Sequence, residues 1–332
     1  MSNQYLRRST LVVMSAPPAA ATESVAGSNP IPNGLDLSTL HFTFKTTQSD
    51  TLTPNTMVVR IFNLSDATLK RIKKEFNQVI LSAGYENGNY GVVFNGVIKQ
   101  VRSGRLPNNV DTFCDLLCAD DIFFNYAILN TTLAAQATSP AQVLAAIQGS
   151  GTLQAVGTDV APNTFTGGVL PRGKVMYGMT SDHLETFAAT HNYSASVQNG
   201  KLVVLPFDGY RPGEAVVLTA ATGLIGAPEQ TDSGISLKCL LNPLIKIGGL
   251  VKIDNSLITQ TTNTGANPEA VPYNQRAGVQ LLPTIANDGV YRVYVIEHEG
   301  DTRGTPWYSD IIALSVDASA PPGSSVQDAG PG

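Results

Sequence analysis

The chain has 332 residues and a formal net charge of −5, with 42% hydrophobic and only 14% charged residues. Average soluble domains are about 25% charged, so we expect much of this surface to contact other protein chains. The acidic balance argues against nucleic-acid binding, which needs clustered Lys and Arg. No apolar run of about 20 residues is present, and the polar start lacks a signal-peptide core, so no membrane span is predicted.

The three cysteines are not expected to form disulfides, and Cys114 and Cys118 are interpreted as small core residues. Cys114, Cys118 and Cys239 are odd in number and widely spread, which does not suit a disulfide framework and fits synthesis in a reducing cytoplasm. Cys114 and Cys118 would lie on one side of a strand, without further ligands at zinc-finger spacing.

The N-terminal third is predicted to be mostly β-structure. Residues 5–14 form a first strand candidate, and residues 15–34, rich in Ala, Pro, Ser and Gly, a long loop. Residues 40–44 alternate apolar and polar side chains, the period of a half-buried strand. Residues 55–62 form the next strand.

One helix is predicted after residue 64. Ser65 is a favourable N-cap, and Leu64 and Leu69 are spaced as a hydrophobic staple. Leu69, Ile72 and Phe76 share one helical face, so we expect the helix to plug the open side of a β-barrel or sheet. Its other face carries four cations, interpreted as a solvated helix surface rather than a phosphate site: Lys70, Arg71, Lys73 and Lys74.

Further strands complete a small barrel ending near residue 120. Residues 78–84 and 90–101 form strands joined by a hairpin at 86–89, where Asn-Gly tolerates positive φ. Gly96 is a candidate bulge. Residues 111–119 form the last strand of this set.

The middle of the chain has α+β character. Pro140 occupies the first position of a helix over residues 140–148, where its missing N–H costs least. A loop to about residue 173 is followed by a helix over 182–190, capped by Ser181. A hairpin over 193–205 turns at an Asn-Gly pair.

The last third returns to strands, predicted at residues 234–240, 250–253, 290–299 and 307–316. The fold class is therefore mainly β with an α+β insert: two small β-barrel domains flank a middle α+β domain. We expect the first barrel at residues 1–125, the middle domain at 126–228, the second barrel at 229–316 and a flexible C-terminal tail at 317–332.

No candidate site emerges for catalysis, a cofactor or a metal. The four histidines are not clustered, and no HExxH, GxGxxG, P-loop or GxSxG motif is present. Residues 297–301 gather carboxylates around His298, from which an acid–base pair could be built. Strand alternation would instead put His298 on one face and both glutamates on the other. Asp120 and Asp121 are interpreted as a loop. The remaining histidines are His41, His183 and His191.

Three stretches together resemble a known family. The first runs from Leu35-Asp36-Leu37 through residues 53–56 to Val59-Arg60-Ile61-Phe62-Asn63-Leu64-Ser65. The second is Ala83-Gly84-Tyr85-Glu86 followed by residues 93–98. The third combines residues 291–294, 297–304 and 307–309. These resemble the baseplate hub proteins of tailed bacteriophages, over about residues 4–316. The strand-to-helix junction at residues 59–65 is the most specific piece.

The resemblance implies a structural virion protein of the tail baseplate, made in the host cytoplasm and without enzymatic activity. It implies a homotrimer whose two barrels per chain form a ring of pseudo-six-fold symmetry. The implied partners are the tail tube protein, the central spike protein and other baseplate subunits, while DNA would pass the lumen without specific binding. Alternatives are a tail tube or distal-tail adaptor protein, a type VI secretion spike, or a baseplate-associated cell-wall hydrolase.

Overall fold

The structure is a computed structural model that describes most of the chain. The described residues are 5–15, 34–107, 110–120, 128–135, 140–148, 157–160, 169, 171–199, 201–207, 209–231, 233–259, 285–286 and 288–315. The predicted loop after residue 15, except its last residue, and the predicted tail after residue 316 lie outside these ranges.

The fold is mainly β, as the sequence predicted, and a single 13-stranded sheet dominates the described residues. Its N-terminal strands are β1 (Arg7–Met14), β2 (Gly34–Asp36), β3 (Phe42–Ser49), β4 (Thr56–Phe62), β5 (Gln78–Tyr85), β6 (Tyr90–Arg105) and β7 (Thr112–Ala119). Its C-terminal strands are β13 (Val216–Val217), β14 (Leu224–Thr231), β15 (Gly234–Leu240), β16 (Leu250–Lys252), β17 (Val290–Asp301) and β18 (Trp307–Ser315). The main path runs β14-β15-β18-β17-β3-β4-β7-β6-β5-β1-β2, with β13 and β16 beside it.

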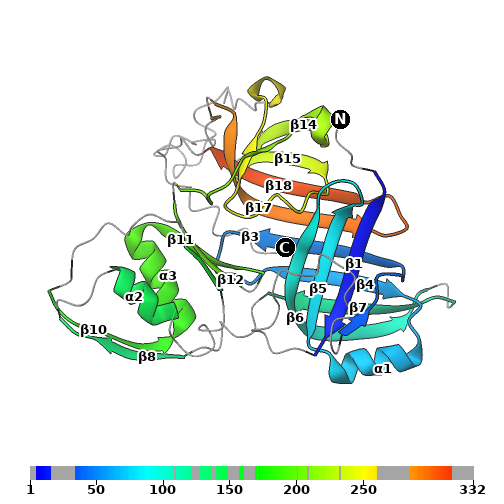
Figure 1. The fold of residues 1–332 in the computed structure, drawn as a ribbon, viewed down its shortest axis with the longest axis horizontal. Coiled ribbons are helices and arrows are strands. Elements are labelled where there is room, and N and C mark those ends of the chain that lie inside the picture. The colour runs from blue at the N-terminus through cyan, green and yellow to red at the C-terminus, as the bar shows by residue number, and fades with distance from the viewer. Residues whose placement is uncertain are drawn as a thin grey trace, which may run out of the picture.

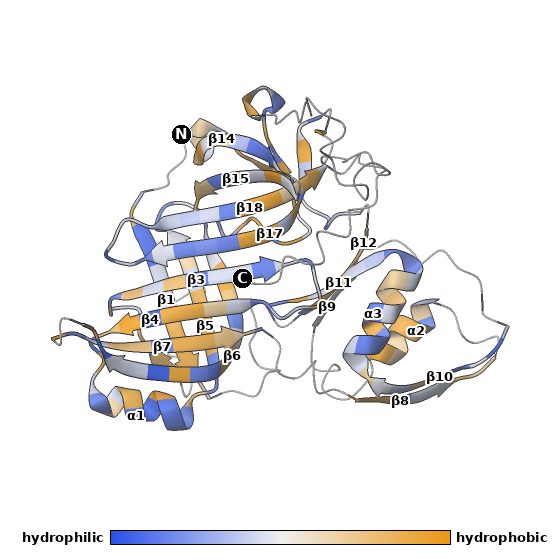
Figure 2. Ribbon diagram, turned by 180° about the vertical axis from the view of Figure 1, so that it is seen from behind, coloured by the Kyte–Doolittle hydropathy of each residue, from blue (hydrophilic) through white to orange (hydrophobic). Residues whose placement is uncertain are grey.

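The N-terminal strands fold over one another around a first core. Figure 1 shows β1, β5 and β6 crossing in front of β3, β4 and β7, and the long strand β6 pairs with both β5 and β7. Leu11, Val59, Leu81 and Leu116 from the crossing strands pack together in this core. Apolar residues dominate β4, β5 and β7 in Figure 2 because these strands supply its walls.

Helix α1 (Asp66–Glu75) lies at one end of this core, as predicted. Thr68 N donates to the Ser65 hydroxyl, which confirms the N-cap. Ile72 is 1% exposed, and Leu69 and Phe76 pack against the same core. The four basic residues of the helix are exposed, which agrees with the solvated-face interpretation.

The C-terminal strands build a second core on the same sheet. Strand β17 pairs antiparallel with β3, with Glu299 opposite Lys45, so the two ends of the chain meet in one sheet. Ile235, Val251 and Ile311 form part of the second core, together with Leu218 and Leu224 from β13 and β14 and the turn between them. The two closed barrels remain a prediction.

The middle segment packs to one side of the large sheet (Figure 1). Two small sheets flank its helices: β8 (Ile128–Leu133) pairs with β10 (Lys174–Met179), and β11 (Tyr193–Gln198) pairs with β12 (Lys201–Pro206), which also pairs with β9 (Gly157–Val160). Helix α2 (Pro140–Gln148) has the predicted bounds, and α3 (Thr180–His191) packs beside it through a shared apolar core.

Two local predictions are wrong. Helix α3 begins at Thr180 with Met179 as N-cap and no side-chain cap bond, because the Ser181 hydroxyl donates to Asp182 instead. Gly96 is not a bulge: the register shifts fall between Leu81 and Ser82 and between Ile98 and Gln100. A Cβ at Gly96 would lie 2.7 Å from the Ala119 carbonyl oxygen, so this glycine permits a close approach between strands.

The hairpin at residues 86–89 forms, although not with the expected backbone. Positive φ occurs at Gly84 (154°) rather than at Asn87 or Gly88. Six strands of the described part had no predicted counterpart: β2, β8, β9, β10, β13 and β14. Strand β14 carries a register shift between Ile225 and Glu229, which obscures its alternation.

Candidate functional site

His298 and the neighbouring Glu297 each have a structural partner in the fold. His298 is 2% exposed, and its Nδ1 lies 2.7 Å from the Ser309 hydroxyl oxygen. Burial lowers the pKa of His298 to about 4, so the ring is neutral at pH 7. Glu297 lies on the opposite face, where it pairs with Lys45 at 2.9 Å. The predicted alternation is confirmed, and it keeps these carboxylates away from the imidazole.

The other histidines and the cysteines are placed by packing. His41 stacks on Phe62 and lies 2.9 Å from an Asp301 carboxylate oxygen. His191 contacts the Phe187 ring at the end of α3. All three cysteines are free and buried, which confirms the core interpretation of Cys114 and Cys118. Within the described ranges, no group of three or more His, Cys, Asp or Glu side chains is placed to hold a metal ion.

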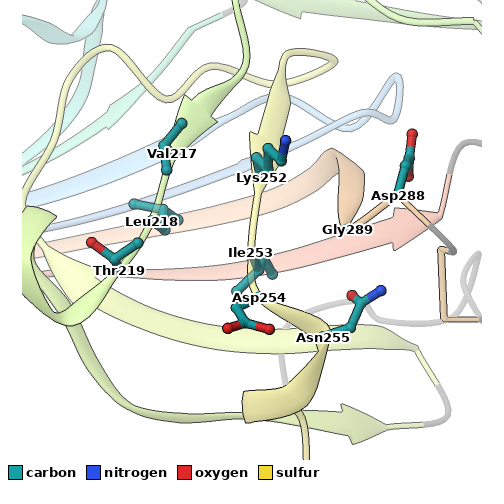
Figure 3. Close-up of a pocket in the computed structure, with 9 residues that line it drawn as sticks. All are labelled: Val217, Leu218, Thr219, Lys252, Ile253, Asp254, Asn255, Asp288 and Gly289. Atoms are coloured by element: carbon teal, nitrogen blue, oxygen red, sulfur yellow. The ribbon is translucent and has the colours of Figure 1, made fainter.

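A shallow hollow of about 470 Å³ lies between β13 and β16 (Figure 3). Asp254, Lys252, Thr219 and Asp288 are among its lining residues. Asp254 Oδ1 accepts hydrogen bonds from the hydroxyl and the backbone N–H of Ser256, which hold the pKa of this carboxyl below its usual value. Asp254 is therefore ionised at neutral pH.

Asp288 and Asn255 of the hollow also have structural partners. Asp288 Oδ1 accepts from Val290 N at 3.0 Å, and Asn255 Nδ2 donates to the Ala286 carbonyl. Asn255 Oδ1 accepts from the Tyr291 hydroxyl at 2.8 Å. These carboxylates and the amide shape turns, so the hollow is better suited to contacting a protein surface than to acid–base chemistry.

The most heavily buried polar cluster joins the middle segment to the large sheet. Arg292 of β17 is 5% exposed and Asp50, after β3, is 3% exposed. Arg292 Nη2 donates to Asp50 Oδ2 and to the Ser194 hydroxyl of β11. Arg292 Nη1 donates to the carbonyls of Pro206, Phe207 and Gly209 at 2.8–2.9 Å. One guanidinium thus binds both the large sheet and the end of the β11–β12 hairpin.

Burial raises the pKa of Asp50, an effect that outweighs the stabilisation of its carboxylate by Arg292. A buried pair of this kind is costly to assemble and costly to break. The pair instead fixes how the hairpin is oriented on the large sheet, because the planar guanidinium of Arg292 binds several acceptors at once.

A second cluster completes this junction at the other end of the hairpin. Asn55 Nδ2 donates to Val197 O and Gln198 Oε1, both at 2.9 Å, and to Asp120 Oδ2 at 3.3 Å. Gln198 Nε2 donates back to Ser49 O at 2.8 Å. Asp120 follows the end of β7 in a bend, as expected of a loop residue, and its carboxylate belongs to this buried network, whereas Asp121 lies outside the described ranges.

This junction was not predicted from the sequence. The only local signal for it is a lone arginine, Arg292, within the apolar run Val290–Ile296. A buried Arg needs acceptors, but its partners come from positions 50, 194 and 206–209, and the sequence does not indicate that they meet. No helix in the described part has the length and apolarity to cross a membrane.

Comparisons with solved structures place the fold among tail proteins. The prophage MuSo2 43 kDa tail protein from Shewanella oneidensis matches with a TM-score of 0.52 at 8% identity, covering 93% of this chain and 97% of that one. A tail protein from Neisseria meningitidis MC58 matches with a TM-score of 0.53 at 8% identity, covering 94% and 97%.

A third solved structure comes from a secretion system. The E. coli c3393 protein, a component of the type VI secretion system with structural similarity to the T4 tail proteins gp27 and gp5, matches with a TM-score of 0.51. The identity is 10%, and the match covers 88% of this chain and 75% of that one. At such identities these matches establish the fold alone.

The family assignment rests on a match between the sequence and a family model. No curated protein sequence matches the chain. The family model described as Baseplate hub gp41 matches residues 54–265, well over half of the chain. This span includes the strand-to-helix junction at residues 59–65, the middle segment and the hollow residues 217–219 and 252–255, but not Asp288 and Gly289. The chain belongs to the Baseplate hub gp41 family of phage tail proteins.

Proposed function

We propose that the chain is the structural hub of a phage tail baseplate, a homotrimer that joins the tail tube to the central spike. The observation that carries the proposal is one continuous sheet with two separately packed cores in a chain of this family. Two similar units per chain would let three chains present six positions to a six-fold tube and three to a spike.

The assembled particle would be the virion, with the tail tube, the spike and other baseplate subunits as neighbours. DNA would cross the ring lumen without specific contacts, in keeping with the net charge of −5. A non-enzymatic role is supported by the structural hydrogen bonds and ion pairs of the Asp254, Asp288 and Glu297 carboxylates.

The domain division also remains a proposal: barrels at residues 1–125 and 229–316, a middle domain at 126–228 and a tail at 317–332. Leu218 and Leu224 pack in the second core although they precede residue 229. A boundary near residue 209, after the last carbonyl bound by Arg292, therefore suits this core better.

The first test is the mass of the purified chain in solution, by light scattering across a concentration series. The expected mass is three times that of the 35.0 kDa chain. A stable hexamer would contradict the hub stoichiometry and favour the alternative of a tube or distal-tail adaptor, because such a ring needs six single-unit chains.

A second test uses native tail particles, imaged with and without this chain. Three copies at the junction of tube and spike are expected. Six copies along the tube, or none in the tail, would overturn the proposal. Clearing of peptidoglycan by the purified chain would instead favour the alternative of a baseplate-associated hydrolase.

A further inference from the structure

The charges of the chain are unevenly distributed between its two ends. Among the residues that the structure describes, residues 5–120 contain eleven Lys and Arg against eight Asp and Glu, whereas residues 229–315 contain five against seven. The first set supplies most of the first core and the second set most of the second core, so this difference in charge is also a difference in position.

The cations of the N-terminal part gather around α1, on a surface that we call the basic end. Lys73 Nζ donates to the Ser103 hydroxyl at 2.9 Å, so the exposed half of β6 lies beside the helix. The basic end consists of exposed residues from these two elements: Lys70, Lys73, Lys74, Lys99 and Arg102. Figure 2 shows several hydrophilic residues along α1.

The opposite end of the large sheet is acidic and partly apolar. Asp254 and Asp288 line the hollow in Figure 3, and Glu229 of β14 is exposed beside Thr259, with which it forms a β-bridge. Three exposed apolar side chains lie around the same place, at 36–50% exposure: Val217, Ile225 and Leu257. We call these six residues the acidic end.

The two ends lie far apart. Figures 1 and 2 both show α1 at one extremity of the large sheet and β14 at the other. A contact between two different, complementary surfaces at opposite extremities is head-to-tail, and repetition of such a contact produces a closed ring when the rotation closes.

We propose that the basic end of one copy docks on the acidic end of the next copy. The inference rests on the proposed ring and specifies which surfaces close it. The exposed apolar side chains of the acidic end supply contact area, and its carboxylates select the lysine-bearing helix. Charged rims of this kind set orientation and association rate, while apolar contacts supply most of the binding free energy.

Lys252 provides a test in which a substitution should strengthen self-association, because it is a cation among the carboxylates of the hollow. Its own charge opposes the docking of lysines. Replacing Lys252 with Ala should therefore tighten association, whereas a purely apolar contact would be unchanged or weakened by the loss of the lysine stem.

The main experiment measures the dissociation constant of self-association by sedimentation for a charge-exchange set. The basic-end variant is Lys70→Glu with Lys74→Glu, since these exposed lysines project from α1. The acidic-end variant is Glu229→Lys with Asp288→Asn, where Asn keeps an acceptor for Val290 N. The combined variant carries all four changes.

Each variant at one end should weaken association about tenfold or more at low salt, and the combined variant should recover most of that loss. Raising the salt concentration from about 0.05 to about 0.5 M should weaken the wild-type contact. It should also reduce the differences in dissociation constant between the variants and the wild type. Thermal melts should be unchanged, because none of the four side chains is buried.

Arg172→Glu with Lys246→Glu is the matched control, because it makes the same change in net charge at exposed residues outside both ends. Control and basic-end variants that weaken association equally would overturn the docking and indicate only net repulsion. A combined variant as weak as the product of its parts would overturn the pairing, even if the trimer itself persists. A wild-type chain that stays monomeric at about 1 mM would overturn self-docking. The hub function is tested separately, by the images of native tail particles.

Discussion

Asn63 explains why the strand-to-helix junction is the most specific part of the sequence. Its φ of 54° lies in the left-handed region, which Asn tolerates better than most residues. Its side chain bridges to the next hairpin: Nδ2 donates to Asp111 Oδ1, and Oδ1 accepts from Thr112 N, both at 3.0 Å. One residue thus turns the chain and anchors the β6–β7 turn.

Replacing Asn63 with Ala should lower the free energy of unfolding by about 2–3 kcal/mol, because it loses two hydrogen bonds and strains the left-handed backbone. Asn63→Gly should cost less, since Gly restores the backbone but not the bonds. Urea unfolding of the three chains checks this order. Equal stability of Ala and Gly variants would show that the backbone angle does not matter.

His298 predicts a pH dependence of stability. Its pKa is lowered from 6.5 to about 4, so between those pH values the unfolded chain binds more protons than the folded chain. Stability is therefore full above pH 6.5 and falls as the pH decreases toward 4, by about 3 kcal/mol from this group. Unfolding curves across this range should lose that slope in His298→Gln. An unchanged slope would assign the acid sensitivity to other groups.

At the scale of elements, α1 is held by one apolar face. Ile72 is 1% exposed in the first core, while Lys70 and Lys74 on the same helix are exposed. The helix is 10 residues long, too short to persist by itself in water, so packing must stabilise it.

Ile72→Ala should therefore destabilise the chain by about 2–5 kcal/mol through lost burial and the cavity left behind. Lys74→Ala, on the exposed face of the same helix, should change stability by less than about 0.5 kcal/mol. Thermal melts compare the two variants directly. Similar losses for both would contradict the placement of Ile72 in the core.

At the scale of the whole molecule, the junction around Arg292 attaches the middle segment to the large sheet. The guanidinium binds Asp50 and the carbonyls that end the β11–β12 hairpin. Arg292→Met would leave the Asp50 carboxylate buried without its counter-ion, at a cost of about 3–5 kcal/mol.

Hydrogen exchange in Arg292→Met should accelerate first at β11 and β12, before the first core responds, because their anchor has gone. The double variant Arg292→Met with Asp50→Asn should be more stable than the single variant, since no unpaired charge remains. Uniform acceleration over the whole chain would mean that the junction is not a separate attachment.

Local patterns in the sequence determined much of the fold. Alternation at residues 40–44, the Ser65 cap and the helical spacing of Leu69, Ile72 and Phe76 each depend on side chains a few positions apart. Bonding and burial between such neighbours are governed by period and capping chemistry, so they can be predicted without tertiary contacts. The same reasoning identified the buried Cys114 and Cys118 and the orientation of His298.

Only the tertiary structure decided how distant segments combine. The pairing of β17 with β3 joins residues about 250 positions apart, and the Arg292 junction gathers partners from three separate segments. Neither leaves a periodic signal, because sheet pairing and buried ion pairs depend on where the chain returns and not on the residues beside it. The sequence by itself therefore determined the elements and the family resemblance, and the tertiary structure decided that both cores share one sheet with opposite charge at its two ends.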